Sequence, residues 1–555
     1  MRHVVTVFTV FMFFFLTLGA FAQDEFGRVS VIPADSLDPG GFGGIVAGVD
    51  FDGDGNSEIY AVNNDWVDII GADLVPRLYK YERDTNGDWT VVWWTRLPFD
   101  FQNTWPAFEY ADLDNDGRKE IVWGPVNNFG AGTNPNPPRI VVYESAGDGS
   151  DVMGVDNGDG TFRPNAEWNL DLADETNVRP FRWLMHDIDG DGTTEIVTAL
   201  RAGDNRAQIY SVDNIPDNGD SSEVWTMEFN GLGSSTNYDL AILNGTAYFI
   251  SSGGNVTGVT WDATADTFAI GPTQDGLVPG GSWKSASVVD FGDGSGDVIV
   301  LASWAPGDAD PDNKAIRLLQ QDADTLLATV IADFDDTIPN NRRLNGGDAG
   351  DIDGDGNWDF VFGVRNFDTP VGPPAAVVRL EYLGGDITDP ASFQQSILDS
   401  SIIGENGAQV DVIEVMDVDF DGVDEVVYAG VTRPFGSGPP TLPITILKSG
   451  VAVSVPSDRD LAPRRFVLHQ NYPNPFNPAT QISYDLFQDA AVLLKIYNLR
   501  GQEVRTLVDE TKPAGTYTVR WDGSSNAGTR VASGVYIYVL RAGEFVQSRR
   551  MTFIK

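Results

Sequence analysis

The sequence predicts an all-β protein, a seven-bladed β-propeller followed by a small immunoglobulin-like β-sandwich. Three observations lead to this prediction. A nine-residue acidic motif recurs over about the first 450 residues, and each copy lies between short apolar runs rich in β-branched and aromatic residues. Over about the last 90 residues the pattern changes to period-2 alternation interrupted by Gly and Asn. No amphipathic helical pattern competes with these strand signals.

The N-terminus predicts export. Arg2 precedes an apolar run, residues 4–18, and the small-residue stop at 20–22, so residues 1–22 are predicted to be a signal peptide cleaved before Gln23. No later stretch approaches the roughly 20 apolar residues of a membrane-spanning helix, so we expect no transmembrane segment after cleavage. The chain has no cysteine, which excludes disulfides. Bound calcium is the expected substitute, because a ligand that binds only the folded state stabilises that state.

Five acidic loops carry the main functional prediction. Loop A is residues 50–58, loop B 112–120, loop C 187–195, loop D 351–359 and loop E 417–425. Each has carboxylates at positions 1, 3, 5 and 9 and Gly at position 6. Ca²⁺ takes six to eight oxygen ligands at about 2.3–2.6 Å, which alternating Asp in a tight turn can supply, and the backbone carbonyl at position 7 can add one more. We therefore predict about five Ca²⁺ sites. The predicted ligands are Asp50, Asp52, Asp54, Asn56 and Glu58; Asp112, Asp114, Asp116, Arg118 and Glu120; Asp187, Asp189, Asp191, Thr193 and Glu195; Asp351, Asp353, Asp355, Asn357 and Asp359; and Asp417, Asp419, Asp421, Val423 and Glu425.

Two other interpretations of these loops compete with a calcium site. An EF-hand needs an acidic residue at position 12 and flanking helices. Position 12 is instead Ala61, Trp123, Thr198, Phe362 or Tyr428, and an apolar strand-like run follows each loop. The remaining alternative is a metal-free turn, because Asp and Gly favour turns without any ion. Five copies in the same pattern favour the metal site.

The loop spacing predicts seven repeats. Loops C and D are 164 residues apart, which leaves room for two degenerate units. One begins at Asp239 and has lost the acids; the other retains Asp290, Asp293 and Asp297, a doubtful sixth Ca²⁺ site. Four apolar runs can be found in each of the first three units, and four antiparallel strands repeated seven times are typical of a β-propeller. The loops and the strands after them resemble the FG-GAP/VCBS repeat of integrin α-chain propellers over roughly residues 30–450. That resemblance implies calcium in the hairpin between the first two strands of a blade.

The C-terminal region resembles a second family. The residues 470–478, 496–501, 533–536 and 549–555 match the sorting domain of type IX secretion cargo, whose period-2 runs predict a small β-sandwich. The resemblance implies the type IX secretion machinery as partner and a secreted or outer-membrane-surface location in a diderm bacterium. The expected domains are a propeller at 23–457, a linker at 458–465 and the sorting domain at 466–555. The charge distribution supports this boundary. Residues 461–555 carry 12 Lys and Arg against 7 Asp and Glu, whereas the whole chain has a net charge of −45.

Composition excludes several functions. The acidic body repels nucleic acid, whose binding depends on Lys and Arg. After signal removal only His186 and His469 remain, so a Ser-His-Asp or Cys-His triad and a His-based zinc site are difficult to build. A catalytic pair of carboxylates, as glycoside hydrolases use, stays possible. No catalytic residue is therefore assigned, and an enzyme is the less favoured class.

The loops between second and third strands predict a ligand-binding face opposite the calcium loops. They are long, rich in Gly, Pro and Asn, and carry aromatic and Arg side chains suited to recognition. These are Trp66, Phe129, Arg201, Trp304, Arg365, Phe367, Arg433 and Phe435. Blade-to-blade packing is the alternative role for these aromatic residues, and Trp105 and Trp283 are predicted core residues. We expect a binding or adhesion module for a glycan or protein; the alternatives are an extracellular polysaccharide lyase and a passive surface protein.

Overall fold

The protein is all-β, with a single 3₁₀ turn, η1 (Pro390–Ser392), among the described residues. The computed structural model describes residues 26–34, 38, 40–64, 75–98, 103–126, 138–168, 178–203, 205–304, 314–323, 325–334, 343–365, 375–402, 408–432, 443–450, 467–468, 471, 476–486, 490–498, 500, 502–513, 515–542 and 545–554. Within them, no helix is long and apolar enough to cross a membrane. The predicted signal peptide lies outside the described residues.

Five four-stranded antiparallel sheets follow one another along the described chain. The first is β2 (Phe42–Val49), β3 (Glu58–Asn63), β4 (Arg77–Arg83) and β5 (Trp89–Arg96). The second is β6 (Ala107–Ala111), β7 (Glu120–Gly124), β8 (Ile140–Glu144) and β11 (Ala166–Trp168), with a side hairpin of β9 (Val155–Asp156) and β10 (Phe162–Arg163). The third is β12 (Arg179–His186), β13 (Glu195–Ala202), β14 (Ala207–Val212) and β15 (Trp225–Gly231). The fourth is β16 (Asn237–Leu243), β17 (Thr246–Ser251), β18 (Val256–Asp262) and β19 (Thr267–Gln274). The fifth is β20 (Ser287–Asp290), β21 (Asp297–Ala302), β22 (Ala315–Asp322) and β23 (Thr325–Asp333).

An eight-stranded sheet completes this region and contains the first described strand of the chain. One half is β24 (Arg343–Gly350), β25 (Asp359–Arg365), β26 (Ala375–Tyr382) and β27 (Phe393–Ile402). The other half is β28 (Ala408–Met416), β29 (Glu425–Thr432), β30 (Ile444–Ser449) and β1 (Phe26–Ile32). A single residue pair, Arg365 and Gln409, joins the halves. Strand β1 pairs antiparallel with β30, so residues about 420 positions apart complete one sheet.

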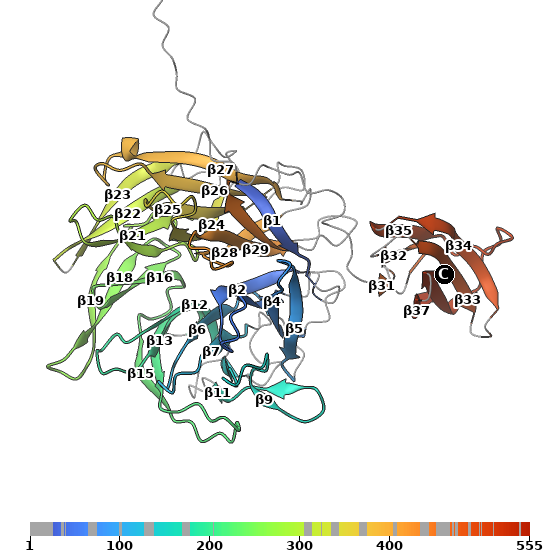
Figure 1. The fold of residues 1–555 in the computed structure, drawn as a ribbon, viewed down its shortest axis with the longest axis horizontal. Coiled ribbons are helices and arrows are strands. Elements are labelled where there is room, and N and C mark those ends of the chain that lie inside the picture. Colours follow the sequence, from blue (N-terminus) through green and yellow to red (C-terminus); the bar gives the residue numbers. More distant parts are fainter. Residues whose placement is uncertain are drawn as a thin grey trace, which may run out of the picture.

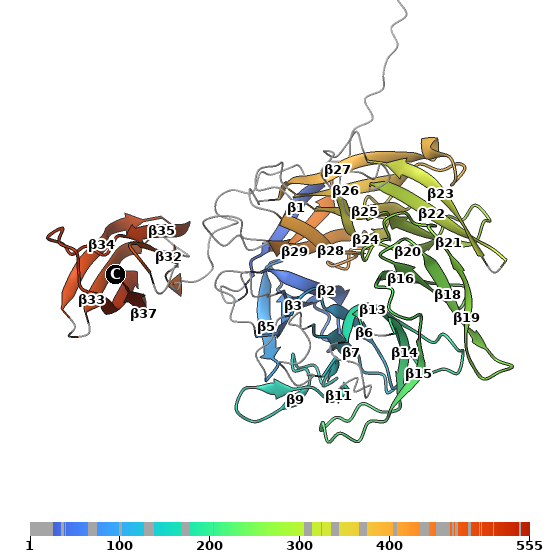
Figure 2. The ribbon, with the colours of Figure 1, turned by 180° about the vertical axis from the view of Figure 1, so that it is seen from behind.

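The sheets are arranged radially, as in a β-propeller (Figures 1 and 2). The first strand of each group contacts the first strands of its neighbours: β2 contacts β6, β6 contacts β12, and the series continues through β16, β20, β24 and β28 back to β2. Apolar residues fill the space between neighbouring sheets. Ile121 and Val141 of the second sheet, for example, pack in one cluster with Val46 and Tyr60 of the first. The apolar runs found in the sequence are therefore the sheet-to-sheet contacts.

The unit that begins at Asp239 is not a degenerate acidic loop. Asp239 lies inside β16, and the hairpin to β17 is formed by Asn244 and Gly245, both with positive φ. An Asn-Gly pair readily adopts that conformation. The repeat spacing predicts a loop that begins at Asp239, whereas strand β16 continues four residues further, to Leu243.

The C-terminal residues form a two-sheet sandwich. One sheet is β31 (Val467–Leu468), β32 (Thr480–Leu486) and β35 (Gly515–Trp521). The other is β34 (Glu503–Lys512), β33 (Ala490–Asn498), β36 (Gly534–Ala542) and β37 (Phe545–Phe553). Inward-facing residues of both sheets form one core that includes Tyr484, Leu494, Trp521, Tyr538 and Phe553. The predicted period-2 pattern is thus the alternation between this core and solvent.

Candidate metal centres and a central cavity

The five acidic loops share one backbone network. Each joins the first and second strands of its sheet, and the position-6 glycines all have φ between 86° and 95°. In every loop that glycine donates its N–H to the position-1 aspartate, over 2.8 to 3.2 Å. The position-7 N–H donates to the position-5 aspartate, over 2.7 to 3.1 Å. A side chain other than hydrogen at position 6 would strain the turn.

The acid at position 9 is held in the same way in all five loops. One carboxylate oxygen accepts the backbone N–H of position 2, over 2.6 to 3.0 Å. This acid begins the second strand of its sheet and is buried in every case. The contact fixes the carboxylate so that its second oxygen faces the carboxylates of the loop, and the five loops differ in what that oxygen meets.

In loops A, D and E a basic side chain from the same sheet meets the second oxygen. Lys80 Nζ lies 2.7 Å from Glu58, Arg379 Nε lies 2.6 Å from Asp359, and Lys448 Nζ lies 2.5 Å from Glu425. Each of these basic groups also contacts the position-3 aspartate: Lys80 at 2.6 Å, Arg379 through Nη2, and Lys448 at 3.0 Å.

The sequence analysis missed these three basic residues. Lys80 lies opposite Tyr60, and Arg379 lies opposite Val361, which in each case is two residues after the position-9 acid. Lys448 follows Leu447, which pairs with Val426. A single basic residue within the third strand was the available signal in β26 and β30, whereas β4 also contains Arg77 and Arg83.

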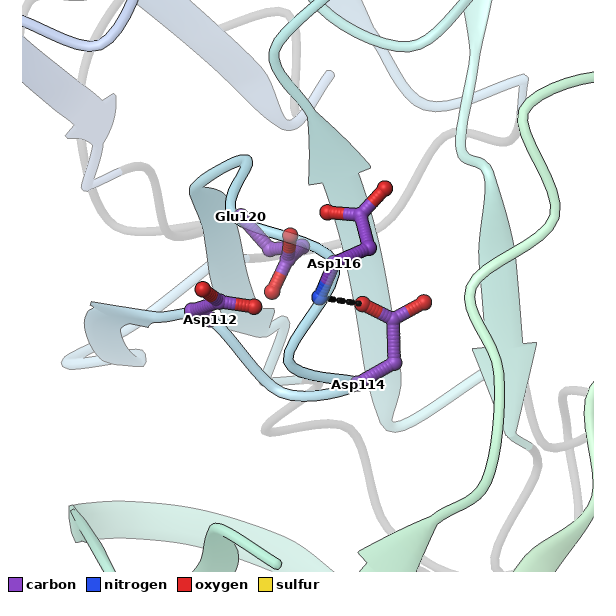
Figure 3. Close-up of side chains that lie close together, drawn as sticks. All are labelled: Asp112, Asp114, Asp116 and Glu120. Atoms are coloured by element: carbon purple, nitrogen blue, oxygen red, sulfur yellow. Dashed lines mark hydrogen bonds between the residues drawn. The ribbon is translucent and has the colours of Figure 1, made fainter.

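In loops B and C the second oxygen has no hydrogen-bond partner among the described residues. Glu120 Oε1 and Glu195 Oε1 are both fully buried and unpaired. The four carboxylates of loop B and the four of loop C each offer oxygens within 4.8 Å of one another. Figure 3 shows Asp112, Asp114, Asp116 and Glu120 gathered around the turn, with the Asp116 N–H donating to Asp114.

The electrostatics of loops B and C reflect uncompensated negative charge. Burial raises the pKa of Glu120 to about 9, and the neighbouring carboxylates of Asp114 and Glu144 add to this. Burial likewise raises the pKa of Glu195 to about 8, with Glu228 and Asp189 contributing. A bound cation would remove this penalty.

Basic side chains offset part of the negative charge of loop B, whereas within the described chain loop C forms no ion pair. Arg118 pairs with Asp116 at 2.7 Å and with Glu144 at 3.0 Å, while Lys119 lies 3.7 Å from Asp112. These contacts leave Asp114 and Glu120 without a basic partner. Clustered carboxylates around a rigid turn match the oxygen ligands that calcium takes, so the residues of loops B and C fit a calcium ion.

The doubtful sixth site has weaker geometry. Asp290, Asp293 and Asp297 are exposed, and the first two accept backbone N–H groups of their own turn, from Gly292 and Ser295. These contacts are those of an ordinary polar turn.

Three of the eight predicted ligand-face residues are described, and they gather around one aromatic cluster. Arg201 lies 5.1 Å from the Trp105 ring, and Arg365 lies 5.9 Å from the Trp304 ring. Trp304 packs 4.8 Å from Trp283. Both Trp105 and Trp283 are buried, as the sequence predicts, and Trp304 is buried as well, with 8% exposure. Trp304 is therefore a packing residue in this structure and not an exposed binding residue. The other predicted residues, Trp66, Phe129, Phe367, Arg433 and Phe435, lie outside the described residues.

A central cavity that the sequence did not predict lies where the first strands converge. Its volume is about 230 Å³, and β2, β6, β12, β24 and β28 contribute to its lining. Four carboxylates line it, those of Glu109, Asp348, Asp411 and Glu414. Two basic residues line it as well: Arg182, which pairs with Asp239, and Lys284, which donates to the Pro106 carbonyl over 2.9 Å and lies 4.9 Å from the Phe181 ring.

Burial dominates the titration of this cavity. It raises the pKa of Glu109 from its usual 4.5 to about 7 and that of Asp348 to about 6. Burial also lowers the pKa of Lys284 to about 8. Because the carboxylates outnumber the basic groups, the cavity suits a ligand that carries positive charge or donates several hydrogen bonds.

We predict that Glu109→Gln raises stability more at pH 8 than at pH 5. The folded pKa of Glu109 lies above its usual value, so the stability present at low pH is lost as the pH rises from about 4.5 to about 7. Glutamine mimics the protonated acid and avoids that loss. One pKa unit corresponds to about 1.4 kcal/mol, and shared protons in the cavity reduce the effect, so we expect about 1 to 2 kcal/mol from urea unfolding at the two pH values. Glu510→Gln, at an exposed position of the C-terminal sandwich, is the control, and equal gains at both pH values would contradict the prediction.

Comparisons with known proteins match one family and several solved structures. The FlgD Ig-like domain family matches residues 476–544. No curated protein sequence matches the chain. Among solved structures, the chain is similar to a periplasmic gluconolactonase of Pseudomonas aeruginosa, with 13% identity, a TM-score of 0.37, and coverage of 63% of this chain and 83% of that one. It is also similar to the WD40 β-propeller domain of Doa1, with 10% identity, a TM-score of 0.40, and 77% and 97% coverage. A third similar structure is BBS1N in complex with ARL6DN, with 9% identity, a TM-score of 0.40, and coverage of 77% of this chain and 99% of that one.

At these TM-scores the backbones differ too much for the function of any neighbour to apply to this chain. The class that the fold and the loops define is a β-propeller with acidic hairpin loops, to which a C-terminal domain is added. That added domain is similar to the FlgD Ig-like domain over 69 residues, 476–544.

Proposed function

We propose that the chain is an exported calcium-binding β-propeller of seven blades that acts as a binding or adhesion module for a glycan or protein. The blade count is supported by the cyclic contacts of β2, β6, β12, β16, β20, β24 and β28. The observation that carries the calcium assignment is the unpaired, fully buried oxygen of Glu120 and of Glu195, each facing three aspartates. Asp112, Asp114, Asp116 and Glu120 would hold one ion, and Asp187, Asp189, Asp191 and Glu195 another.

Calcium at loop B would stiffen a junction between blades. Asn115 of loop B donates to the Gly192 carbonyl of loop C over 3.0 Å, and the Ile215 N–H of the neighbouring sheet donates to Asp114 over 2.8 Å. An ion that fixes Asp114 therefore fixes contacts to the next blade. A rigid ring is what a binding surface requires, since ordering a loop on binding reduces affinity.

The export part of the proposal rests on the two chain ends. Residues 1–22 have the composition of a signal peptide, and residues 466–555 resemble a type IX sorting domain. The domain division at 458–465 and the location, secreted or at the outer-membrane surface, belong to the same proposal. Fractionation of the producing cell, with and without residues 466–555, tests it: loss of surface protein on truncation is expected.

The expected result for calcium is a reversible gain in stability. With free calcium at about 100 times its Kd, each site contributes about 2.7 kcal/mol. Chelation should lower Tm, and calcium but not magnesium should restore it. Glu195→Gln keeps an acceptor for the Ile188 N–H but removes the charge, so it should abolish about half of the calcium-dependent gain. Asp220→Asn, at an exposed aspartate in the loop between β14 and β15, is the matched control. An unchanged Tm in wild type on chelation would refute the calcium assignment.

The ligand is tested with the calcium-loaded protein on glycan and polysaccharide arrays. Binding without new product supports a recognition module.

A second candidate, a carbohydrate-active enzyme, is favoured by the central cavity, where Lys284 and four carboxylates converge. Unsaturated sugar product, lost in Lys284→Met, would establish the enzyme and replace the adhesion proposal.

A further inference from the structure

We infer that only loops B and C bind calcium, and that Lys80, Arg379 and Lys448 take the place of the ion in loops A, D and E. This inference rests on the proposed calcium function and changes its stoichiometry from about five ions per chain to two. It follows from comparing the same atoms in five copies of one loop, rather than from the presence of acidic residues.

Loop A shows the replacement most directly. The Lys80 ammonium lies 2.6 Å from Asp52, 2.7 Å from Glu58 and 2.9 Å from Asp151, and its side chain is 1% exposed. It donates a hydrogen bond to Asp52 and forms ion pairs with Glu58 and Asp151. The ammonium therefore occupies the position where an ion would need the same oxygens.

Loops D and E repeat the arrangement with different chemistry. In loop D the Arg379 guanidinium bridges Asp353 and Asp359 from a buried position. In loop E the Lys448 ammonium reaches Asp419, Asp421 and Glu425 over 2.5 to 3.0 Å. A divalent ion in either loop would have to displace a tethered cation and would be repelled by it.

The three loops in which a basic side chain contacts the carboxylates of positions 3 and 9 are neighbours in the ring. Loop D belongs to the half-sheet β24 to β27, loop E to the half-sheet β28 to β30, and loop A to β2 to β5. Strand β28 contacts both β24 and β2. These sheets form the arc that β1 completes by pairing with β30. The arc in which the ring closes therefore carries its own cations and does not depend on external calcium, whereas the two adjoining sheets with loops B and C do.

The primary test counts calcium bound per full-length chain by equilibrium dialysis and elemental analysis. We expect two in wild type, and three in Lys80→Met and in Lys448→Met, because each substitution removes the tethered cation. Lys495→Met, in the C-terminal sandwich, is the control and should leave two. Three or more ions in wild type would overturn the inference while the calcium function stands. Two ions in both loop variants would overturn it as well.

Zero ions in wild type would refute the proposed function and the assignment of calcium to loops B and C. The variants then decide whether a basic side chain takes the place of an ion: one ion gained supports this replacement, and none overturns it. If Lys80→Met is unfolded without calcium, its refolding when calcium is added supports the inference. If both Lys80→Met and Lys448→Met fail to refold in calcium, the inference is overturned. Amide exchange gives an independent readout on wild type. Chelation should speed exchange at least tenfold in loops B and C and less than twofold in loops A, D and E. Equal acceleration in all five loops would contradict the proposal.

Discussion

Removal of residues 26–32 is expected to destabilise the propeller by roughly 5 kcal/mol or more. Strand β1 supplies the outer edge partner of β30, and Phe26 and Ile32 are buried there. Each such side chain contributes about 1.5 to 3 kcal/mol when fully buried. Arg28 also donates to both oxygens of Asp399, over 2.6 and 3.0 Å. Deletion removes the guanidinium from the buried Asp399 carboxylate, which also accepts from the Tyr428 hydroxyl, and breaking a buried pair costs about 3–5 kcal/mol.

Urea unfolding of chains that begin at residue 26 and at residue 33 measures this effect. The chain beginning at residue 26 retains β1 and is the control for the loss of upstream residues. Arg28→Met separates the ion pair from the strand and should account for about 3 kcal/mol of the difference. Equal midpoints for the two truncated chains would show that β1 does not stabilise the ring.

Asp239→Ala is expected to destabilise the protein by about 4 kcal/mol or more, although Asp239 belongs to no acidic loop. Its carboxylate is fully buried. One oxygen accepts from Arg182 of β12 and from the Leu240 N–H, and the other accepts from Ser282 Oγ, the Ser285 N–H at 2.8 Å and the Ala286 N–H at 3.1 Å. The residue thus connects three consecutive sheets. Alanine leaves Arg182 without its counter-charge and several buried donors unsatisfied, each a cost of about 1–3 kcal/mol.

The measurement is equilibrium unfolding in saturating calcium, so that the metal sites do not contribute to the difference. Asp275→Ala, at an exposed position of the turn after β19, is the matched control and should change stability by less than about 0.5 kcal/mol. Asp239→Asn retains two of the acceptor contacts and should fall between alanine and wild type. A loss below about 1 kcal/mol for alanine would mean that the sheets are held together without this residue.

Much of the metal-loop geometry could be predicted because it is local. The contacts that shape each loop join positions 1 and 6, 5 and 7, and 2 and 9, all within nine consecutive residues. The strands after each loop could be predicted for the same reason, since β-branched runs beside a turn favour a hairpin. The number of calcium ions could not, because it depends on Lys80, Arg379 and Lys448, which lie 20 or more residues from the acids that they contact.

The central cavity shows the same limit. Glu109, Asp348 and Glu414 are far apart in the chain, and each is one acid among the 81 of the sequence. Only closure of the ring brings them to one cavity. Trp304 was assigned to a binding surface on its loop position, but its neighbours Trp283 and Tyr238 bury it, because aromatic side chains there fill the space between first strands.

The sequence by itself determined the acidic loops, the order of strands and the change to a second domain, since each depends on residues a few positions apart. The tertiary structure decided which loops retain an unpaired carboxylate oxygen, how β1 joins the far end of the propeller, and which carboxylates share a cavity. These outcomes depend on strand register and ring closure, and both are set by packing between residues tens to hundreds of positions apart.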